Sequence, residues 1–200
     1  MLEIIDYKWA LAGIAALISI CNLIYYISNV IKGKTKPHMY TWLIWGLVTV
    51  IASIAQIMSG GGAGAYYTML IAINCFIIAT LAYFKGEKDI HVSDKYCLFF
   101  CLLAIIIWPL FKTPLLSVLI VTAVDTVGFL PTIRKSYIKP HQENLFSFML
   151  YALTYSLSIA ALETYSFITV FYPAVIVSSA AALAIMLIVR RKQLGYKVFA

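Results

Sequence analysis

The chain has 200 residues, of which 63% are hydrophobic and 12% charged, and its formal net charge at pH 7 is +7. Soluble domains are about 45–50% apolar, so this composition excludes an ordinary water-soluble protein. The mean hydropathy of +0.94 agrees with that exclusion. Because charges fall in short clusters between apolar runs of about 20 residues, the length that crosses a bilayer, we predict an all-α integral membrane protein surrounded by lipid.

Seven apolar runs are candidate transmembrane helices, since the alternation typical of β-barrels is absent. In chain order they are Trp9–Ile31, Met39–Met58, Ala65–Phe84, Tyr96–Phe111, Pro114–Ile133, Leu145–Leu162 and Thr164–Val189. The fourth is the shortest and needs little tilt or a locally thinner bilayer. The first is not expected to be a cleaved signal peptide, because Glu3 and Asp6 precede it and its apolar run is too long.

The basic residues predict how these helices are oriented. With the N-terminus outside, every Lys and Arg except Lys8 and Lys112 falls in an inward-facing loop or in the C-terminal tail. The positive-inside rule therefore favours an outside N-terminus and a cytoplasmic C-terminus. Attraction to anionic inner-leaflet lipid accounts for the net charge, so we expect no nucleic-acid partner. The compact chain and its short tails lead us to expect a bacterial cytoplasmic (inner) membrane.

The two ends of the chain are related by an internal repeat. A shift of 103 residues places Lys36-Pro37-His38 on Lys139-Pro140-His141, and Asn22 on Asp125. Three helices per half would reverse the second half, so repeats of one orientation require a linking helix. We predict a 3+1+3 organisation, with bundles over residues 1–90 and 113–200 and a linker over 91–112. Parallel repeats are typical of transporters with a site between the halves, and the alternative is a chance similarity of two basic loops.

The stretch from Gly128 to Tyr137, followed by Asn144-Leu145-Phe146-Ser147, resembles the PQ-loop motif of the SWEET and PQ-loop transporter superfamily. Pro131 stands at the motif proline, although Thr132 replaces the motif Gln and Ser28 occupies the proline position of the first half. The resemblance implies seven helices, a 1-3-2 helix order in each bundle and alternating access for small polar solutes. The chain is also similar to bacterial seven-helix members of unassigned function, which leaves the solute open.

Candidate solute-binding residues lie near the middle of the predicted helices. Asp125 is the only charged residue inside any of them, about 16 Å from Pro114 at about 1.5 Å per residue. A carboxylate at that depth must face a polar cavity, find a partner or bind a proton, so Asp125 is also the candidate for proton coupling. The alternative is a protonated Asp125 that ties two helices together.

Other polar and aromatic residues complete the predicted site. The polar candidates are Asn22, Asn74, Ser178 and Ser179, for which hydrogen bonding between helices is the alternative. Trp45 and Tyr151 are candidates for stacking on a solute, with membrane anchoring as the alternative. Five further aromatic residues are assigned to the interfacial belt: Trp9, Trp42, Tyr66, Tyr67 and Trp108. Pro131 and Pro173 remove helical hydrogen bonds and are candidate hinges.

The remaining candidates for chemistry are the three histidines. His38 and His141 follow prolines in the two matching loops, where contact with lipid headgroups is expected, and His91 is isolated. Without a nucleophile–base pair or a set of metal ligands, we expect no enzymatic activity, no cofactor and no metal. The leading hypothesis is a transporter, and its rival is a receptor or assembly factor that moves no solute. The sequence leaves open whether copies form a homo-oligomer.

Overall fold

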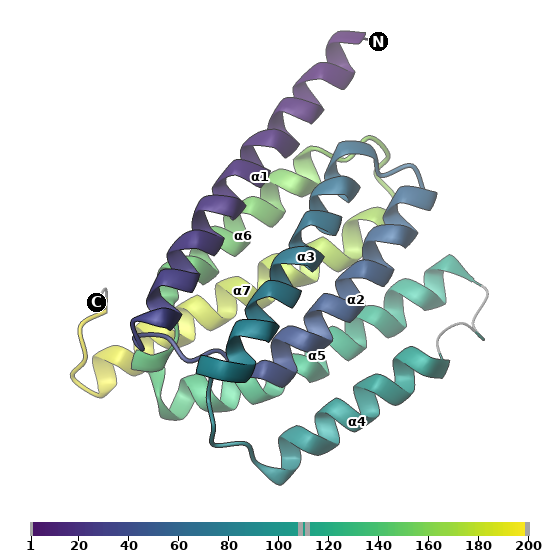
Figure 1. Ribbon diagram of the computed structural model, residues 1–200. Helices are drawn as coiled ribbons and strands as arrows, with labels where there is room; N and C mark the ends of the chain where they lie inside the picture. Colours follow the sequence, from purple (N-terminus) through teal and green to yellow (C-terminus); the bar gives the residue numbers. More distant parts are fainter. Residues whose placement is uncertain (1, 108–109, 111–112, 199–200) are drawn as a thin grey trace.

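The computed structural model describes residues 2–107, 110 and 113–198, which form seven α-helices and no strand (Figure 1). The helices are α1 (Leu2–Ile31), α2 (Met39–Met58), α3 (Gly62–Lys85), α4 (Val92–Ile107), α5 (Pro114–Ile138), α6 (Leu145–Ala160) and α7 (Phe167–Gln193), and a short 3-10 helix, η2 (Pro140–Gln142), precedes α6. The prediction of an all-helical chain with seven helices is confirmed.

Five of these helices are long and apolar enough to cross a membrane. The qualifying segments are Tyr7–Ile31, Met39–Met58, Gly62–Lys85, Leu115–Ile138 and Phe167–Gln193. Helices α4 and α6 have 16 residues each, fewer than the roughly 20 of a full crossing. Large apolar side chains such as Leu17, Ile24 and Ile185 are exposed on the outer surface, which is the arrangement expected in lipid. The chain is therefore an integral membrane protein.

Polar residues explain why two helices differ from their predicted bounds. Helix α4 begins at Val92 instead of Tyr96, because the Asp94 carboxylate in its first turn accepts the backbone N–H of His91 at 2.9 Å. Its predicted end, Phe111, and the belt residue Trp108 lie outside the described residues. Helix α7 begins at Phe167 instead of Thr164, because Ser166 and Thr169 form a capping box there.

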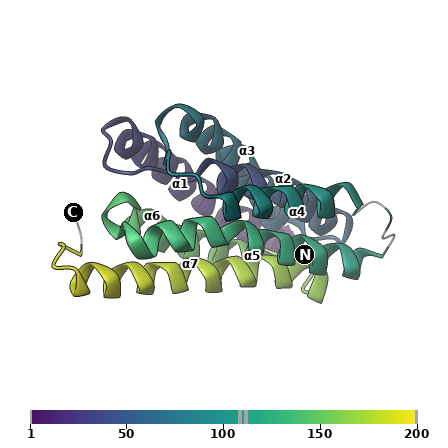
Figure 2. The ribbon, with the colours of Figure 1, turned by 90° about the horizontal axis from the view of Figure 1, so that it is seen from below.

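The helices pack in two groups, with α1, α2 and α3 in one layer and α5, α6 and α7 in the other (Figure 2). In the first group α3 contacts both α1 and α2, and in the second group α7 contacts both α5 and α6. Between the groups, α1 meets α6, α2 meets α5 and α7, and α3 meets α6. Helix α4 packs mainly against α5 and to a lesser extent against α2.

One glycine permits a very close approach between the two groups. A Cβ atom at Gly64 of α3 would lie 2.4 Å from the backbone oxygen of Ser158 in α6. Small residues at helix contacts let backbones approach in this way within membranes. By contrast, a Cβ atom at Gly13 of α1 would have no atom within 4 Å.

The two prolines predicted as hinges lie inside helices, Pro131 in α5 and Pro173 in α7. Because proline has no N–H, Pro173 leaves the carbonyl of Thr169, four residues earlier, without its helical donor. The Gln56 side chain of α2 donates to that carbonyl at 3.0 Å. A hydrogen bond between the two groups thus compensates for the break in α7. Whether either proline acts as a hinge stays a prediction.

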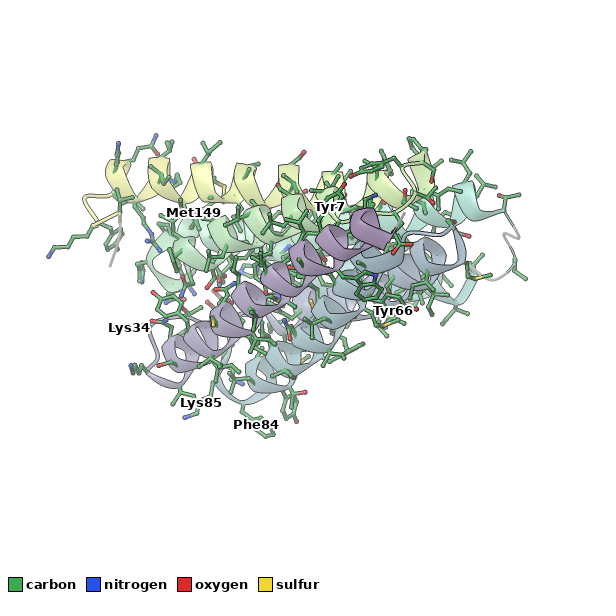
Figure 3. All side chains as sticks on the ribbon, turned by 90° about the horizontal axis from the view of Figure 1, so that it is seen from above. Tyr7, Lys34, Tyr66, Phe84, Lys85 and Met149 are labelled. Carbon is green, nitrogen blue, oxygen red and sulfur yellow. The ribbon has the colours of Figure 1, made fainter. Side chains whose placement is uncertain are left out.

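Four of the belt assignments can be compared with the structure. Trp9 and Tyr66 are exposed and stack with ring centroids 5.7 Å apart, as expected for interfacial residues. Tyr66 lies far from the Lys34 and Lys85 end of the molecule (Figure 3). Trp42 and Tyr67, however, are only 1% and 3% exposed. Their assignment to the belt is wrong, because both side chains point into the protein core instead of toward lipid.

We expect Gly64→Ala to destabilise the protein by about 1–3 kcal/mol. The added methyl group would collide with the backbone of Ser158 and push α3 away from α6. Thermal unfolding of the purified protein in detergent measures the change. Gly13→Ala is the matched control and should stay within about 1 kcal/mol of the wild type. Equal stability of the two variants would contradict the close approach.

Candidate functional site

A small cavity, here called the central cavity, lies in the core where α2, α3, α5, α6 and α7 meet. Its volume is about 40 Å³, room for a few water molecules. Seven of the lining residues are aromatic: Trp42, Trp45, Phe129, Phe148, Tyr151, Tyr155 and Tyr172. Among the residues that the structure describes, Asp125 is the only Asp, Glu, Lys, Arg or His in the lining. The cavity therefore combines aromatic walls with a single acidic group.

Asp125 is held by a short chain of hydroxyl groups. The Tyr172 hydroxyl of α7 donates to Asp125 Oδ1 at 3.3 Å, and Thr49 Oγ1 of α2 lies 2.7 Å from the same hydroxyl. Because Tyr172 gives its one proton to Asp125, Thr49 must donate to Tyr172. Asp125 is 2% exposed, and it forms no ion pair with a Lys, Arg or His among the described residues.

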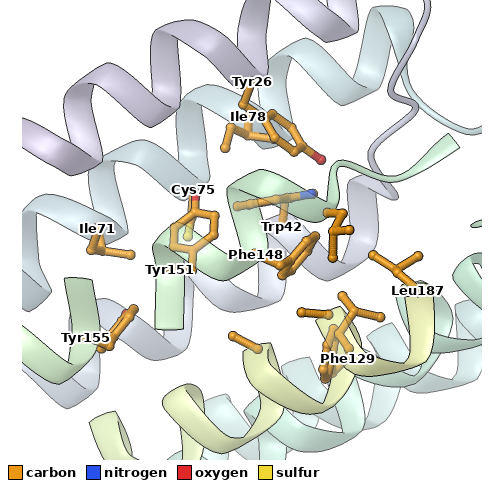
Figure 4. Close-up of a cluster of buried hydrophobic side chains, with 14 of the residues drawn as sticks. Tyr26, Trp42, Ile71, Cys75, Ile78, Phe129, Phe148, Tyr151, Tyr155 and Leu187 are labelled. Carbon is orange, nitrogen blue, oxygen red and sulfur yellow. The ribbon is translucent and has the colours of Figure 1, made fainter. Parts of the chain in front are cut away.

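The aromatic walls are built from rings of α2, α5, α6 and α7, and Figure 4 labels some of them, such as Trp42, Phe129 and Tyr151. The Trp42 ring lies 5.1 Å from Trp45 and 6.0 Å from Tyr151, between centroids. Trp45 lies 5.2 Å from Phe129 of α5 and 6.4 Å from Phe148 of α6. The indole N–H of Trp45 is buried and has no hydrogen-bond partner in the described part of the chain. This donor is therefore free to bind an acceptor atom.

The structure brings four of the seven predicted binding residues to this cavity. Trp45, Asp125, Tyr151 and Ser179 line it. Ser178 does not, because neighbouring residues on a helix point about 100° apart, and its exposed hydroxyl donates to Ala174 O at 2.9 Å.

The two predicted asparagines are buried outside the lining, and each bonds to another helix. The Asn22 amide of α1 donates to the Ser147 carbonyl of α6 at 3.3 Å. The Asn74 amide of α3 donates to Ser19 Oγ of α1 at 3.0 Å. For both residues, hydrogen bonding between helices was the predicted alternative to solute binding, and these contacts are hydrogen bonds of that kind. Nothing in them orients either side chain toward a solute.

Several lining residues were not singled out from the sequence. Phe148 lies three residues before the predicted Tyr151 and Tyr155 four residues after it, so the three share one face of α6, and this spacing could have identified the whole face. No local pattern marks Thr49 or Tyr172. Their role depends on which helices meet at Asp125, and that information is absent from the sequence of any single helix.

At one end of the bundle, α1, α3, α5 and α7 finish, and most of the basic residues lie there; we call it the basic end. Glu143, 2% exposed, forms a buried ion pair with Lys135. The Tyr26 hydroxyl of α1 also donates to Glu143 Oε1 at 3.0 Å. Lys135 donates in addition to the Lys36 carbonyl at 2.6 Å. These contacts join the loops before α2 and α6.

A second buried acid at the basic end attaches α4 to the bundle. Asp94 Oδ2 lies 2.8 Å from the Arg134 guanidinium of α5 and 3.2 Å from Nε2 of His38. His38 is fully buried, so the expected contact with lipid headgroups is wrong for this residue. Burial holds the pKa of His38 below its usual value, and the nearby Asp94 only partly opposes that effect.

Comparison with known proteins gives no independent assignment for this site: no family model, no curated protein and no solved structure matches the chain. The function must therefore be argued from the central cavity and from the packing of the helices around it.

We expect Glu143→Gln to cost about 3–5 kcal/mol of stability, because it leaves the buried Lys135 ammonium without its counter-ion. Thermal unfolding in detergent measures the loss. Asp89→Asn is the control, since Asp89 is exposed and pairs with Lys139 at 3.3 Å at the surface of the same end; its melting temperature should stay close to that of the wild type. A small effect of Glu143→Gln would show that the buried pair does not hold this end together.

Acidification should destabilise the protein through His38. Its pKa is lowered in the folded state and is about 6.5 in an unfolded chain, so the unfolded chain binds more protons as the pH falls through that range. The contribution of His38 to the free energy of unfolding is complete above about pH 6.5. It is lost as the pH falls toward the lowered pKa that His38 has in the folded state. Melting temperatures from pH 8 to 5 should therefore fall less for His38→Gln than for the wild type. His91→Gln, at an exposed histidine, should keep the wild-type slope, and a wild-type slope in His38→Gln would contradict this assignment.

Proposed function

We propose that this protein is a membrane transporter that moves a small polar solute by alternating access. The observation that carries the proposal is the central cavity, in which Asp125 lies buried between two groups of helices. A carboxylate deep in an apolar bundle is costly to keep and marks a solute or proton pathway by default. Asp125 is also our candidate for proton coupling.

The packing of the helices supports two parallel bundles joined by a linker. If α1, α2 and α3 are matched with α5, α6 and α7, every contact between the groups has a counterpart. The α1–α6 contact corresponds to α5–α2, and the α3–α6 contact corresponds to α7–α2. Within each group the third helix touches the first and the second, in agreement with a 1-3-2 order. Helix α4 has no counterpart, which fits a 3+1+3 organisation.

The cavity lies where this repeat would place a transport site. The 103-residue shift pairs Trp45 with Phe148; both rings line the cavity and meet edge to face, with centroids 6.4 Å apart. The same shift pairs Asn22 with Asp125, so only the second half supplies an acid. We further propose an outside N-terminus in a bacterial inner membrane, following the distribution of basic residues.

Hydrogen bonds join the two bundles at both ends in this conformation, which fits an occluded state. At the basic end, the Lys36 amide donates to the Gln142 carbonyl at 2.9 Å. At the opposite end, the Glu163 amide donates to the Gly61 carbonyl at 3.2 Å, and Lys8 donates to the Leu162 carbonyl. Each contact joins one bundle to the other. Alternating access would therefore require one of these two sets to separate while the other stays closed.

A receptor or assembly factor with the same fold is the second candidate. It is favoured by the hydrogen bonds that Asn22 and Asn74 form with other helices, since these polar groups then serve packing. The small volume of the cavity, about 40 Å³, points the same way. Flux measurements separate the two candidates.

The transport test uses purified protein in liposomes and a panel of small radiolabelled polar solutes, both charged and neutral. At least one solute should enter faster than into protein-free liposomes, and Asp125→Asn should slow that uptake at least about tenfold, a loss of about 1.4 kcal/mol. Thr126→Val is the matched control, because Thr126 is next to Asp125 but exposed and bonded to the Thr122 carbonyl. An imposed pH gradient should alter wild-type uptake but not that of Asp125→Asn, if the carboxyl group couples protons. Wild-type rates in Asp125→Asn would exclude Asp125 from the pathway, and no flux of any solute would favour the second candidate.

A further inference from the structure

We infer that the central cavity selects small organic cations, namely compounds with an ammonium group. The inference deepens the proposed function, because it names the substrate class of the same site. It depends on the proposed function only for transport, since selective binding can be measured without flux.

The first observation is the isolation of the acid. Asp125 is buried, receives one hydrogen bond from Tyr172 at 3.3 Å and has no basic partner among the described residues. An ionised carboxylate in apolar surroundings is costly unless a positive charge accompanies it. A cationic ligand would supply that charge, whereas an anionic ligand would repel the carboxylate and would find no Lys, Arg or His in the lining.

The second observation is the aromatic wall around the acid. Trp42, Trp45 and Phe129 belong to a continuous set of rings whose neighbouring centroids are 5.1–5.2 Å apart. The faces of such rings carry negative charge density and attract cations within about 6 Å of the centroid. Cages of aromatic rings are the usual binding sites for methylated ammonium groups. An acid next to several aromatic rings is therefore the chemistry that recognises an organic cation.

The lining is poorly suited to a neutral polyhydroxylated solute. Such a solute needs many hydrogen-bonding groups, and the Thr49 hydroxyl is already bonded to Tyr172. The buried indole N–H of Trp45 has no partner in the described chain, so it can bind one oxygen atom. The best match is an ammonium compound that also carries a hydroxyl or carboxyl oxygen. The cavity of about 40 Å³ admits water-sized guests, so entry of such a compound requires the bundles to separate.

The test compares choline with 3,3-dimethylbutan-1-ol, which has the same shape but carries a carbon atom where choline has its charged nitrogen. Both are titrated into the 200-residue chain in detergent at constant ionic strength, with calorimetry and thermal unfolding as readouts. Choline should bind and raise the melting temperature, and the alcohol should bind at least about tenfold more weakly. Equal affinities, or no detectable binding of choline, would overturn the inference.

Variants then locate the binding. Asp125→Asn should weaken choline binding at least about tenfold and leave the alcohol unaffected, while Thr126→Val should bind choline like the wild type. If Asp125→Asn does not fold, Phe129→Leu removes one ring face and should weaken choline binding more than alcohol binding. Choline affinity that no cavity variant changes would overturn the site.

The two proposals can fail separately. Uptake of a neutral or anionic solute without choline binding would overturn the cation inference and leave the transporter proposal in place. Selective choline binding without flux of any solute would support the cation site and overturn transport.

Discussion

Every polar atom inside an apolar bundle must find a partner, because neither lipid nor core can replace water, and most of this structure follows from that constraint. Pro173 frees the Thr169 carbonyl, and Gln56 of another helix binds it. The buried acid Glu143 is matched by a buried Lys135. The Gln56–Thr169 bond joins two helices that are distant in sequence, so the need for partners also helps to fix which helices are neighbours. In the lining of the central cavity, the described chain gives Asp125 one hydrogen bond and the Trp45 indole none, so these two groups are placed to meet a ligand.

Charge is used differently at the basic end and at the centre. At the basic end, the acids Glu143 and Asp94 are each paired with cationic side chains, and the resulting network closes loops against each other. Removing one member of such a pair leaves a buried charge without its partner, so the members of the network stabilise the fold together. At the centre, a single acid has only a tyrosine hydroxyl as its partner within the described part of the chain. At the basic end the protein itself neutralises the charge of each acid, whereas the charge of Asp125 is neutralised only by a proton or a bound cation.

The helices could be predicted from the sequence because the length of an apolar run is itself a physical requirement of the bilayer. The helix ends were less accurate: α1 begins at Leu2 instead of Trp9, and α5 ends at Ile138 instead of Ile133. The starts of α4 and α7 depend on hydrogen bonds of Asp94 and Ser166. Asp125 could be singled out because a charge inside an apolar run needs an explanation. The depth of Trp42 along its helix could be read from the sequence, but the direction in which it points could not, and so it was assigned to lipid when it is buried. Tyr172 was missed for the same reason, because its role depends on its contact with Asp125, which lies on another helix.

The isolation of Asp125 has an electrical consequence. An ionised carboxylate without a basic partner gives the empty site a charge of about −1, and a bound monovalent cation brings the site to neutrality. Moving an elementary charge through a membrane potential changes the energy by about 2.3 kcal/mol per 100 mV. The potential would then act on the return of the empty carrier and hardly on the loaded one. In the proposed transport cycle, a single acid whose counterpart in the proposed repeat is Asn22 would therefore determine which half of the cycle is sensitive to voltage.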